Sequence, residues 1–286
     1  MTAAAAAMRR IRRYALFALV AAIPVLLVAV PLATFLANSF FRLEDGQIVH
    51  DLTLANYGTF FADPTYWGVL LKTLWLCARV TLICLAIGFP IAWFVWRQPP
   101  ARRTLLLLLI VLPLFMSYIV KLYTMRSILG LNGLLNQALL GLGILSAPTT
   151  ALLYNQTAVL VTLAVLFLPF LVLPVFLSLE RVPASLLHAS ADLGASPWRT
   201  FRHVVLPLAL PGTIAGTLFA FVLSLGDYIT PQMVGGTSGF TFGRVIWSQF
   251  GMAYNWPLGA ALGVMLFLVC GVVIALAGAV SRRRVV

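Results

Sequence analysis

Six long apolar segments dominate this sequence and constrain its fold more than any other feature. They cover residues 14–37, 73–96, 104–123, 158–177, 207–228 and 257–280. A helix needs about 20 mostly apolar residues to cross a bilayer, and each segment reaches that length. Only 9% of the 286 residues are charged, whereas soluble domains carry about 25%. The sequence therefore predicts an all-α polytopic membrane protein with six transmembrane helices and excludes a soluble globular enzyme.

The first apolar segment allows two interpretations. Arg9, Arg10, Arg12 and Arg13 precede it, as in a signal peptide. Its apolar stretch, however, is longer than the roughly 7–15 residues of a signal-peptide core. We expect a retained first helix over 14–37, core helices within 73–280, and a single transmembrane domain over 1–286.

The formal net charge of +12 is distributed unevenly between the two sides of the expected membrane. The side that holds both termini carries 13 of the 19 Lys and Arg residues and two of the seven acids. Loops rich in Lys and Arg face the cytoplasm. We therefore expect both termini to be cytoplasmic, and the basic excess reports this orientation, not a nucleic-acid partner.

The loop over 178–206 is the only one on the cytoplasmic side that is long enough to fold. Pro183 favours a first helical turn, so a short helix is expected over 184–193. Gly194 suits a left-handed helix cap, and Ser196-Pro197 is typical of a new helix start. A second helix is expected over 197–206, ending at Pro207. Because a ten-residue helix is marginal alone, it either lies against the chain's own helix ends or docks on a separate protein.

The same loop carries a family pattern. Inner-membrane permeases carry Glu-Ala-Ala, three residues, Gly, nine residues, Ile, one residue and Leu-Pro, known as the EAA motif. The loop matches it at Ala189, Gly194, Val204 (for Ile), Leu206 and Pro207, and departs at His188 (for Glu) and Ser190 (for Ala). The chain thus resembles an ABC-importer permease of the type I fold. Stretches 54–57, 88–92, 132–136, 192–202, 206–216, 226–231 and 255–261 are similar to the spermidine/putrescine subfamily.

The resemblance implies a division of labour among subunits of a transporter in the bacterial inner membrane. The 184–193 helix would be the coupling helix, seated in a cytoplasmic ABC ATPase dimer. The expected ATPase contacts are His188, Ala189, Ser190, Asp192, Leu193, Gly194, Ala195, Ser196 and Pro197. Asp192 could partly replace the family Glu that is absent at His188. The other implied partners are a second permease, giving a heterodimer, a periplasmic binding protein and membrane lipid.

Residue patterns for catalysis are missing from the sequence. Neither Lys72 nor Lys121 stands in the Gly-Lys-Ser/Thr context of a phosphate-binding loop, and the three histidines lack metal-ligand spacing. We therefore expect no enzyme activity, no catalytic residue, no metal and no cofactor on this chain. ATP and Mg²⁺ would bind the partner ATPase.

Asp227, at the outer end of the fifth span, is the strongest candidate for contact with substrate. A carboxylate beside an aromatic ring suits a polyamine cation, and Tyr228 and Tyr123 are the aromatic candidates. The alternative is that Asp227 pairs with a basic residue or caps the next turn. Related permeases also carry iron(III), opines and aminoethylphosphonate, and a secondary transporter is a further alternative.

Three other features within the spans allow structural interpretations. Arg79 favours a packed ion pair or a side chain that reaches the interface. Gly212 with Gly216, and Gly259 with Gly263, allow two helices to approach closely.

Overall fold

The computed structural model describes residues 3–284 and forms two compact units. The first unit contains the described residues up to Ala62 together with Ser248–Leu266, and the second contains Asp63–Trp247 together with the described residues from Phe267 onward. The prediction of one domain over 1–286 stays a prediction.

The first unit contains α1 (Ala3–Asn38), α2 (Ala55–Ala62), the end of α12 (Phe242–Gly251) and the start of α13 (Trp256–Arg284). The Phe35 and Phe250 rings lie 6.1 Å apart between centroids. A Cβ on Gly263 would lie 2.6 Å from the Phe35 ring, and one on Gly259 would lie 2.9 Å from the Phe250 ring. Both glycines therefore permit close packing within this unit, as expected.

Two short strands in the first unit depart from the all-α prediction. β1 (Arg42–Glu44) pairs antiparallel with β2 (Gln47–Val49), with Leu43 opposite Ile48. Asp45 and Gly46 join them with φ of +49° and +78°. Two consecutive positive φ angles are typical of the tight hairpin turn that Asp-Gly favours.

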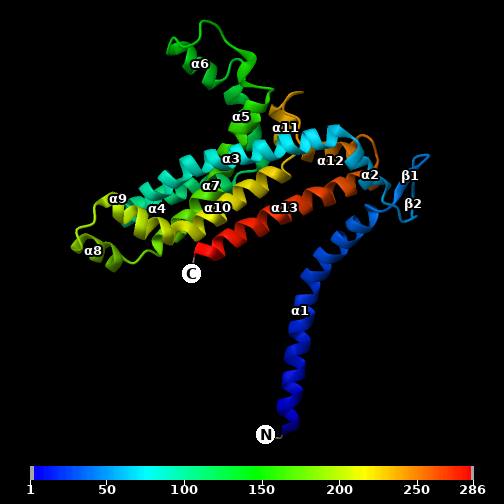
Figure 1. Ribbon diagram of the computed structural model, residues 1–286, viewed down its shortest axis with the longest axis horizontal. Helices are drawn as coiled ribbons and strands as arrows, with labels where there is room; N and C mark the ends of the chain where they lie inside the picture. Colours follow the sequence, from blue (N-terminus) through cyan, green and yellow to red (C-terminus); the bar gives the residue numbers. More distant parts are fainter. Residues whose placement is uncertain (1–2, 285–286) are drawn as a thin grey trace. The chain divides into compact units, whose positions relative to one another are not determined.

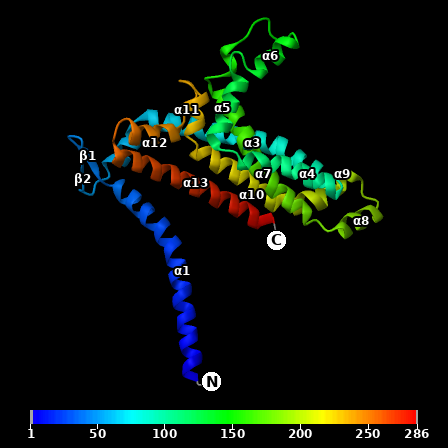
Figure 2. The same ribbon diagram turned by 180° about the vertical axis from the view of Figure 1, so that it is seen from behind.

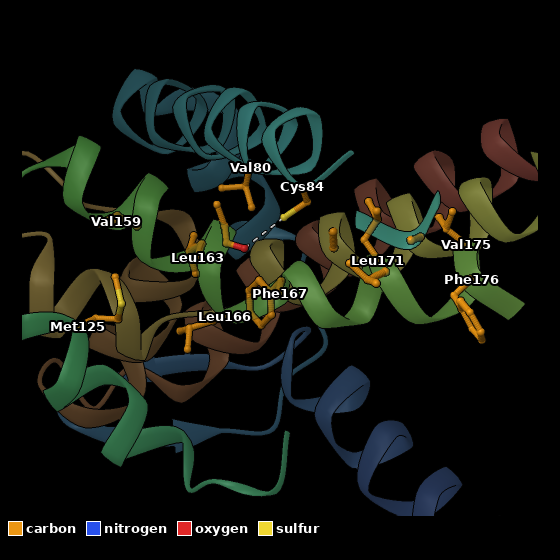
Figure 3. Packing of buried hydrophobic residues seen from close by; sticks show 14 of the residues in the cluster. Val80, Cys84, Met125, Val159, Leu163, Leu166, Phe167, Leu171, Val175 and Phe176 are labelled. Carbon is orange, nitrogen blue, oxygen red and sulfur yellow. Dashed lines mark hydrogen bonds between the residues drawn. The ribbon is translucent and has the colours of Figure 1, made fainter. Parts of the chain in front are cut away.

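Three helices form the core of the second unit: α3 (Pro64–Trp96), α7 (Gln156–Glu180) and α10 (Leu206–Gly226). They lie side by side in both views (Figure 1, Figure 2). Figure 3 shows the packed apolar side chains between them, including Leu163, Leu171 and Val175 of α7, each at most 1% exposed.

The small residues Gly212 and Gly216 of α10 lie directly against α7. A Cβ on Gly212 would lie 2.2 Å from the Pro174 carbonyl oxygen, and one on Gly216 would lie 2.9 Å from the Leu171 carbonyl oxygen. Ser178 adds polar contacts here, since its Oγ donates to the Leu208 carbonyl at 3.1 Å and accepts from the Gly212 N–H at 3.3 Å. The predicted close approach of helices therefore occurs within this subunit.

In residues 3–284, five helices are long and apolar enough to cross a membrane, which confirms the all-α polytopic fold. They are Arg12–Asn38, Pro64–Trp96, Gln156–Glu180, Pro197–Gly226 and Trp256–Ala279. The third span, expected as one helix over 104–123, is instead a bent pair. The chain direction bends by 101° between Pro100–Phe115 and Tyr118–Gly141. If this pair counts as one broken span, the number of crossings rises from five to six.

The bend in the third span has a local cause. α4 (Pro100–Val111) passes into a 3₁₀ turn, η1 (Leu112–Phe115), that contains Pro113. Met116 is then extended, with a ψ of 145°, and Ser117 is also non-helical, with a ψ of 137°, before α5 (Tyr118–Leu129) begins. Figures 1 and 2 both show α5 leaving the α3–α7–α10 bundle crosswise.

The predicted helix end at Pro207 is wrong. α9 (Pro197–Thr200), a π turn η3 (Phe201–Val205) and α10 follow one another without a break, as one helix of 30 residues. Proline lacks an N–H and clashes with the carbonyl four residues earlier. Here the Leu206 N–H bonds to the Phe201 carbonyl, five residues back, and this wider register lets the helix continue through Pro207.

The remaining elements are short and connect the longer helices. They are α6 (Leu134–Gly141), η2 (Thr150–Leu152), α8 (Ala184–Asp192) and α11 (Ile229–Val234).

Candidate functional site

The first candidate site is the helix, turn and helix over residues 184–200, called here the Gly194 segment. Gly194 has a φ of +72°, and its N–H donates to the Ala191 carbonyl at 2.9 Å while the Ala195 N–H donates to the Ser190 carbonyl at 3.0 Å. These bonds close the end of α8. The Ser196 hydroxyl accepts the Arg199 N–H at 3.3 Å and caps α9. The local signals for this segment are therefore confirmed.

The side chains of the Gly194 segment are largely solvent-facing. No residue of α8 is buried, and Leu193 is 87% exposed. His188, Ala189, Asp192, Ser196 and Pro197 are exposed, while Ser190 and Ala195 are half-buried. Ser190 and Thr200 share a hydrogen bond of 2.7 Å between their hydroxyls, which joins α8 to α9. This bond and the glycine cap hold the shape of the segment, and the half-buried Leu187 is the α8 side chain that packs against the apolar core.

A groove of about 580 Å³ lies beside α8. Ala184, Leu187 and Ala191 of α8 line one part of it, and Trp93 and Trp96 of α3 line another. An ion pair of 3.3 Å between Arg103 Nη1 and Glu180 Oε1 lies in the same groove and joins α4 to the end of α7. α8 therefore borders an open groove on one side and solvent on the other.

Phe201 connects the Gly194 segment to the bundle. Its ring centroid lies 4.9 Å from that of Trp93, 5.4 Å from that of Trp198 and 6.0 Å from that of Phe89. Aromatic pairs at this spacing stabilise packing beyond simple burial. Phe201 also begins the π turn that leads into α10. Phe201 therefore holds the Gly194 segment against α3 and is also the first residue of the π turn η3.

The second candidate site is at the opposite end of α10 and is called here the Asp227 site. Asp227 follows the last residue of α10, and its Oδ1 accepts the N–H groups of Ile229 at 3.0 Å and Thr230 at 3.2 Å. Its Oδ2 accepts the Tyr118 hydroxyl at 2.5 Å. The hydroxyls of Tyr118 and Thr230 lie 2.8 Å apart. One carboxylate therefore ties together α5, α10 and α11.

Asp227 caps the next turn and forms no ion pair with a described basic residue. The carboxylate caps the following turn, as one interpretation expected, but no Lys or Arg among residues 3–284 forms an ion pair with it within 4.0 Å. A half-buried carboxylate with no basic partner keeps its negative charge available to a cation. Sequence reasoning missed Tyr118 and Thr230 as its partners, and Tyr118 is 109 positions away with no local motif to signal the contact.

The two other candidate residues differ in their placement. Tyr228 is 37% exposed and stacks on Trp247, with centroids 6.3 Å apart and ring planes at 14°. Tyr123 lies on α5 and is 58% exposed. Within the described part of the chain, Tyr123 makes no hydrogen bond or ring contact with Asp227 or Tyr228. The Asp227 site thus contains Tyr228 as a neighbour but does not include Tyr123.

Several cations near these helices lie over aromatic rings. Arg79 Cζ is 5.9 Å from the Trp75 ring, Lys121 Nζ is 5.6 Å from the Tyr118 ring, and Arg126 Cζ is 5.7 Å from the Tyr154 ring. No carboxylate in the described residues pairs with Arg79, and its Nε is buried without a hydrogen bond. Of the two interpretations of Arg79, the packed ion pair is not found in the described residues, where the guanidinium lies over the Trp75 ring, and a side chain that reaches the interface stays a prediction.

Comparison with known proteins identifies the family. Residues 149–286 match the family model described as "Binding-protein-dependent transport system inner membrane component". The spermidine/putrescine transport system permease protein PotB of Escherichia coli (strain K12) is 36% identical over 259 residues, which cover 90% of this chain and 94% of PotB. The chain belongs to this family of inner membrane components. The expected resemblance is confirmed, and the protein is a multi-pass inner-membrane permease subunit of an ABC importer.

Other relatives agree with this family assignment. PotB of Haemophilus influenzae is 36% identical over 248 residues, covering 86% of each chain. A solved bacterial ABC transporter involved in the import of the acidic polysaccharide alginate matches with a TM-score of 0.74, 16% identity, and coverage of 96% of this chain and 98% of that one. The structural match shows the fold alone. It confirms the type I importer fold that the EAA motif predicted.

Proposed function

We propose that this family member forms, with a second permease subunit, the membrane path for a polyamine such as spermidine or putrescine. The substrate assignment rests on the Asp227 carboxylate. It accepts three hydrogen bonds, and no Lys or Arg of the described residues forms an ion pair with it. Relatives over 86–90% of the chain are named as spermidine/putrescine permeases, which supports the same class of solute.

The Asp227 site favours a cation over the other solutes that related permeases carry. Its carboxylate attracts an ammonium, and the stacked Tyr228 and Trp247 rings offer aromatic faces for cation–π contact. An opine carries carboxylates and aminoethylphosphonate carries a phosphonate beside their ammonium groups, and the Asp227 carboxylate would repel those anionic groups, which a polyamine lacks. Iron(III) requires a cluster of hard ligands, and no group of three or more His, Cys, Asp or Glu gathers in the described residues.

The Gly194 segment is proposed as the contact with a cytoplasmic ABC ATPase dimer. The exposed α8, the half-buried Ser190 of that helix and Ala195 of the following turn, and the open groove beside them support a docking element. Docking would run along His188, Ala189, Asp192 and Leu193. In this proposal ATP and Mg²⁺ bind the ATPase, and this chain holds no cofactor. Both termini are cytoplasmic, and a periplasmic binding protein delivers substrate to the Asp227 end of the permease.

The proposal is tested by transport in a reconstituted system. The complete importer in liposomes, supplied with its binding protein outside and ATP inside, is expected to accumulate radiolabelled putrescine or spermidine only when ATP is present. Unlabelled opine, iron(III) and aminoethylphosphonate at the same concentration should not compete. Uptake driven by an ion gradient without ATP would instead indicate a secondary transporter, and competition by one of the other solutes would reassign the substrate.

A further inference from the structure

Lys121 lies next to the Asp227 site without pairing with its carboxylate. It stands one helical turn after Tyr118 on α5, and its ammonium nitrogen lies 5.6 Å from the centroid of the Tyr118 ring. The hydroxyl of that same ring donates to Asp227 Oδ2 at 2.5 Å. One aromatic ring therefore bears an ammonium on its face and the carboxylate of the site at its hydroxyl.

The chemistry of the Lys121 side chain matches that of the proposed substrate. A lysine side chain is a primary ammonium on a flexible stem of four carbons. Putrescine is a chain of four carbons with a primary ammonium at each end. The side chain of Lys121 is therefore a tethered equivalent of one end of putrescine, held over an aromatic ring of the site.

Building on the proposed function, we propose that Lys121 is a resident ammonium of the Asp227 site. It covers the Tyr118 ring while the site is without substrate, and an arriving substrate ammonium must displace it or bind beside it. Its positive charge on the ring face strengthens the Tyr118 hydroxyl as a donor to Asp227 and lowers the attraction of the site for other cations. Lys121 acts through Tyr118 and is a specificity-determining, positioning residue.

Two other cations of the second unit have different aromatic and carbonyl partners. Arg126 lies over the Tyr154 ring at 5.7 Å. Arg244 donates to the Gly236 carbonyl at 2.9 Å and lies 4.9 Å from the Phe240 centroid. Within residues 3–284, Lys121 is the cation recorded over the Tyr118 ring, so its removal takes that positive charge away from the Tyr118–Asp227 network.

A resident ammonium would serve transport by preventing tight binding. A membrane path must hold its solute strongly enough to admit it and weakly enough to release it. A bare carboxylate with aromatic neighbours would favour retention of a polycation. A lysine that competes from the wall of the site shortens the stay of each substrate ammonium without removing the carboxylate that attracts it.

The test measures binding on the assembled permease–ATPase complex without binding protein or ATP. Radiolabelled putrescine is titrated by scintillation proximity. Lys121→Met keeps the length of the side chain and removes its charge, and it is expected to lower the Kd about two- to five-fold, the range of an exposed cation–π contact. Lys121→Arg should restore the wild-type Kd. Arg126→Met is the matched control, because it removes a cation–π contact from the same helix without touching Tyr118, and its Kd should be unchanged.

A double-mutant cycle separates this role from a merely structural one. In a Tyr118→Phe background, which cuts the bond to Asp227, Lys121→Met should change the Kd less than it does in the wild type. Lys121→Gln provides a second neutral variant if Lys121→Met does not assemble. A Kd that stays unchanged in both neutral variants, or that rises, would overturn the inference and leave the proposed function intact. Absence of polyamine binding by the wild type and the neutral variants alike would overturn both.

Discussion

The two ends of the 30-residue helix Pro197–Gly226 satisfy their polar groups in opposite ways. At the Asp227 end, both carboxylate oxygens accept hydrogen bonds and Thr230 is fully buried. At the Gly194 end, α8 fully buries none of its residues and is held by a glycine cap, one bond between hydroxyls and the packing of Leu187 against the core. The first end satisfies its hydrogen bonds within this chain and leaves only the charge of Asp227 without a described ion pair, whereas the second exposes most of its side chains. This difference supports the proposal that the Gly194 end meets another protein.

The strongest test of this comparison is removal of the uncovered helix. Deletion of residues 184–193 is expected to abolish co-purification with the ATPase while membrane insertion stays normal, because α8 contributes no buried residue to the bundle. Pull-down in mild detergent and membrane fractionation measure the two properties. An ATPase complex that survives the deletion would refute the docking role.

The next largest effect is expected at the opposite end. Asp227→Asn removes the charge but keeps the shape, so ATP-driven polyamine uptake should fall at least tenfold while the complex assembles normally. Asp51→Asn is the matched control, since it removes the same charge from an exposed aspartate whose ion pair with Arg42 is 3.3 Å long. Equal uptake by both variants would remove Asp227 from the substrate path.

A smaller effect is expected when the turn of the Gly194 segment is strained. Gly194→Ala places a side chain at a φ of +72° in open space, so only the backbone conformation is disfavoured. The left-handed conformation costs about 1–2 kcal/mol outside glycine, which would weaken ATPase affinity about five- to thirty-fold. Gly141→Ala, also in open space but without a positive φ, is the control. Surface plasmon resonance with immobilised permease measures both, and indistinguishable affinities would show that the turn geometry does not set docking.

The smallest effect on function is expected midway along the helix. A Cβ on Gly212 would lie 2.2 Å from a backbone carbonyl of α7, so Gly212→Ala should destabilise the bundle by about 1–3 kcal/mol. Gly271→Ala, which meets nothing within 4 Å, should not. Thermal unfolding in detergent compares the two variants, with a lower Tm expected only for Gly212→Ala. An equal fall of Tm in both variants would mean that Gly212 is not required for the close contact between α7 and α10.

Local features were predictable from the sequence because they depend on neighbouring residues. Apolar length marked the spans, and Gly194 with Ser196-Pro197 marked the turn between two helices. The Asp45-Gly46 hairpin was also marked by its sequence, yet the expectation of an all-helical chain passed over it. The bend after Pro113 was less evident, since membrane helices often tolerate proline.

Features that depend on distant residues could not be predicted. Tyr118 reaches Asp227 only because the break before α5 turns that helix across the bundle, and nothing near either residue signals the other. The continuation through Pro207 was hidden for a different reason. In a regular α-helix, Pro207 predicts that the helix ends at Leu206. The helix continues because a π turn precedes the proline.

The uninterrupted helix Pro197–Gly226 has a mechanical consequence. Thirty residues at 1.5 Å each make a rod about 45 Å long. If such a rod tilts by about 5° around one end, the other end moves by about 4 Å, more than the length of the hydrogen bond between Tyr118 and Asp227. If the Gly194 segment docks on an ATPase as proposed, a tilt of this helix is the route by which docking at Phe201 and Trp93 would reach the Tyr118–Asp227 bond.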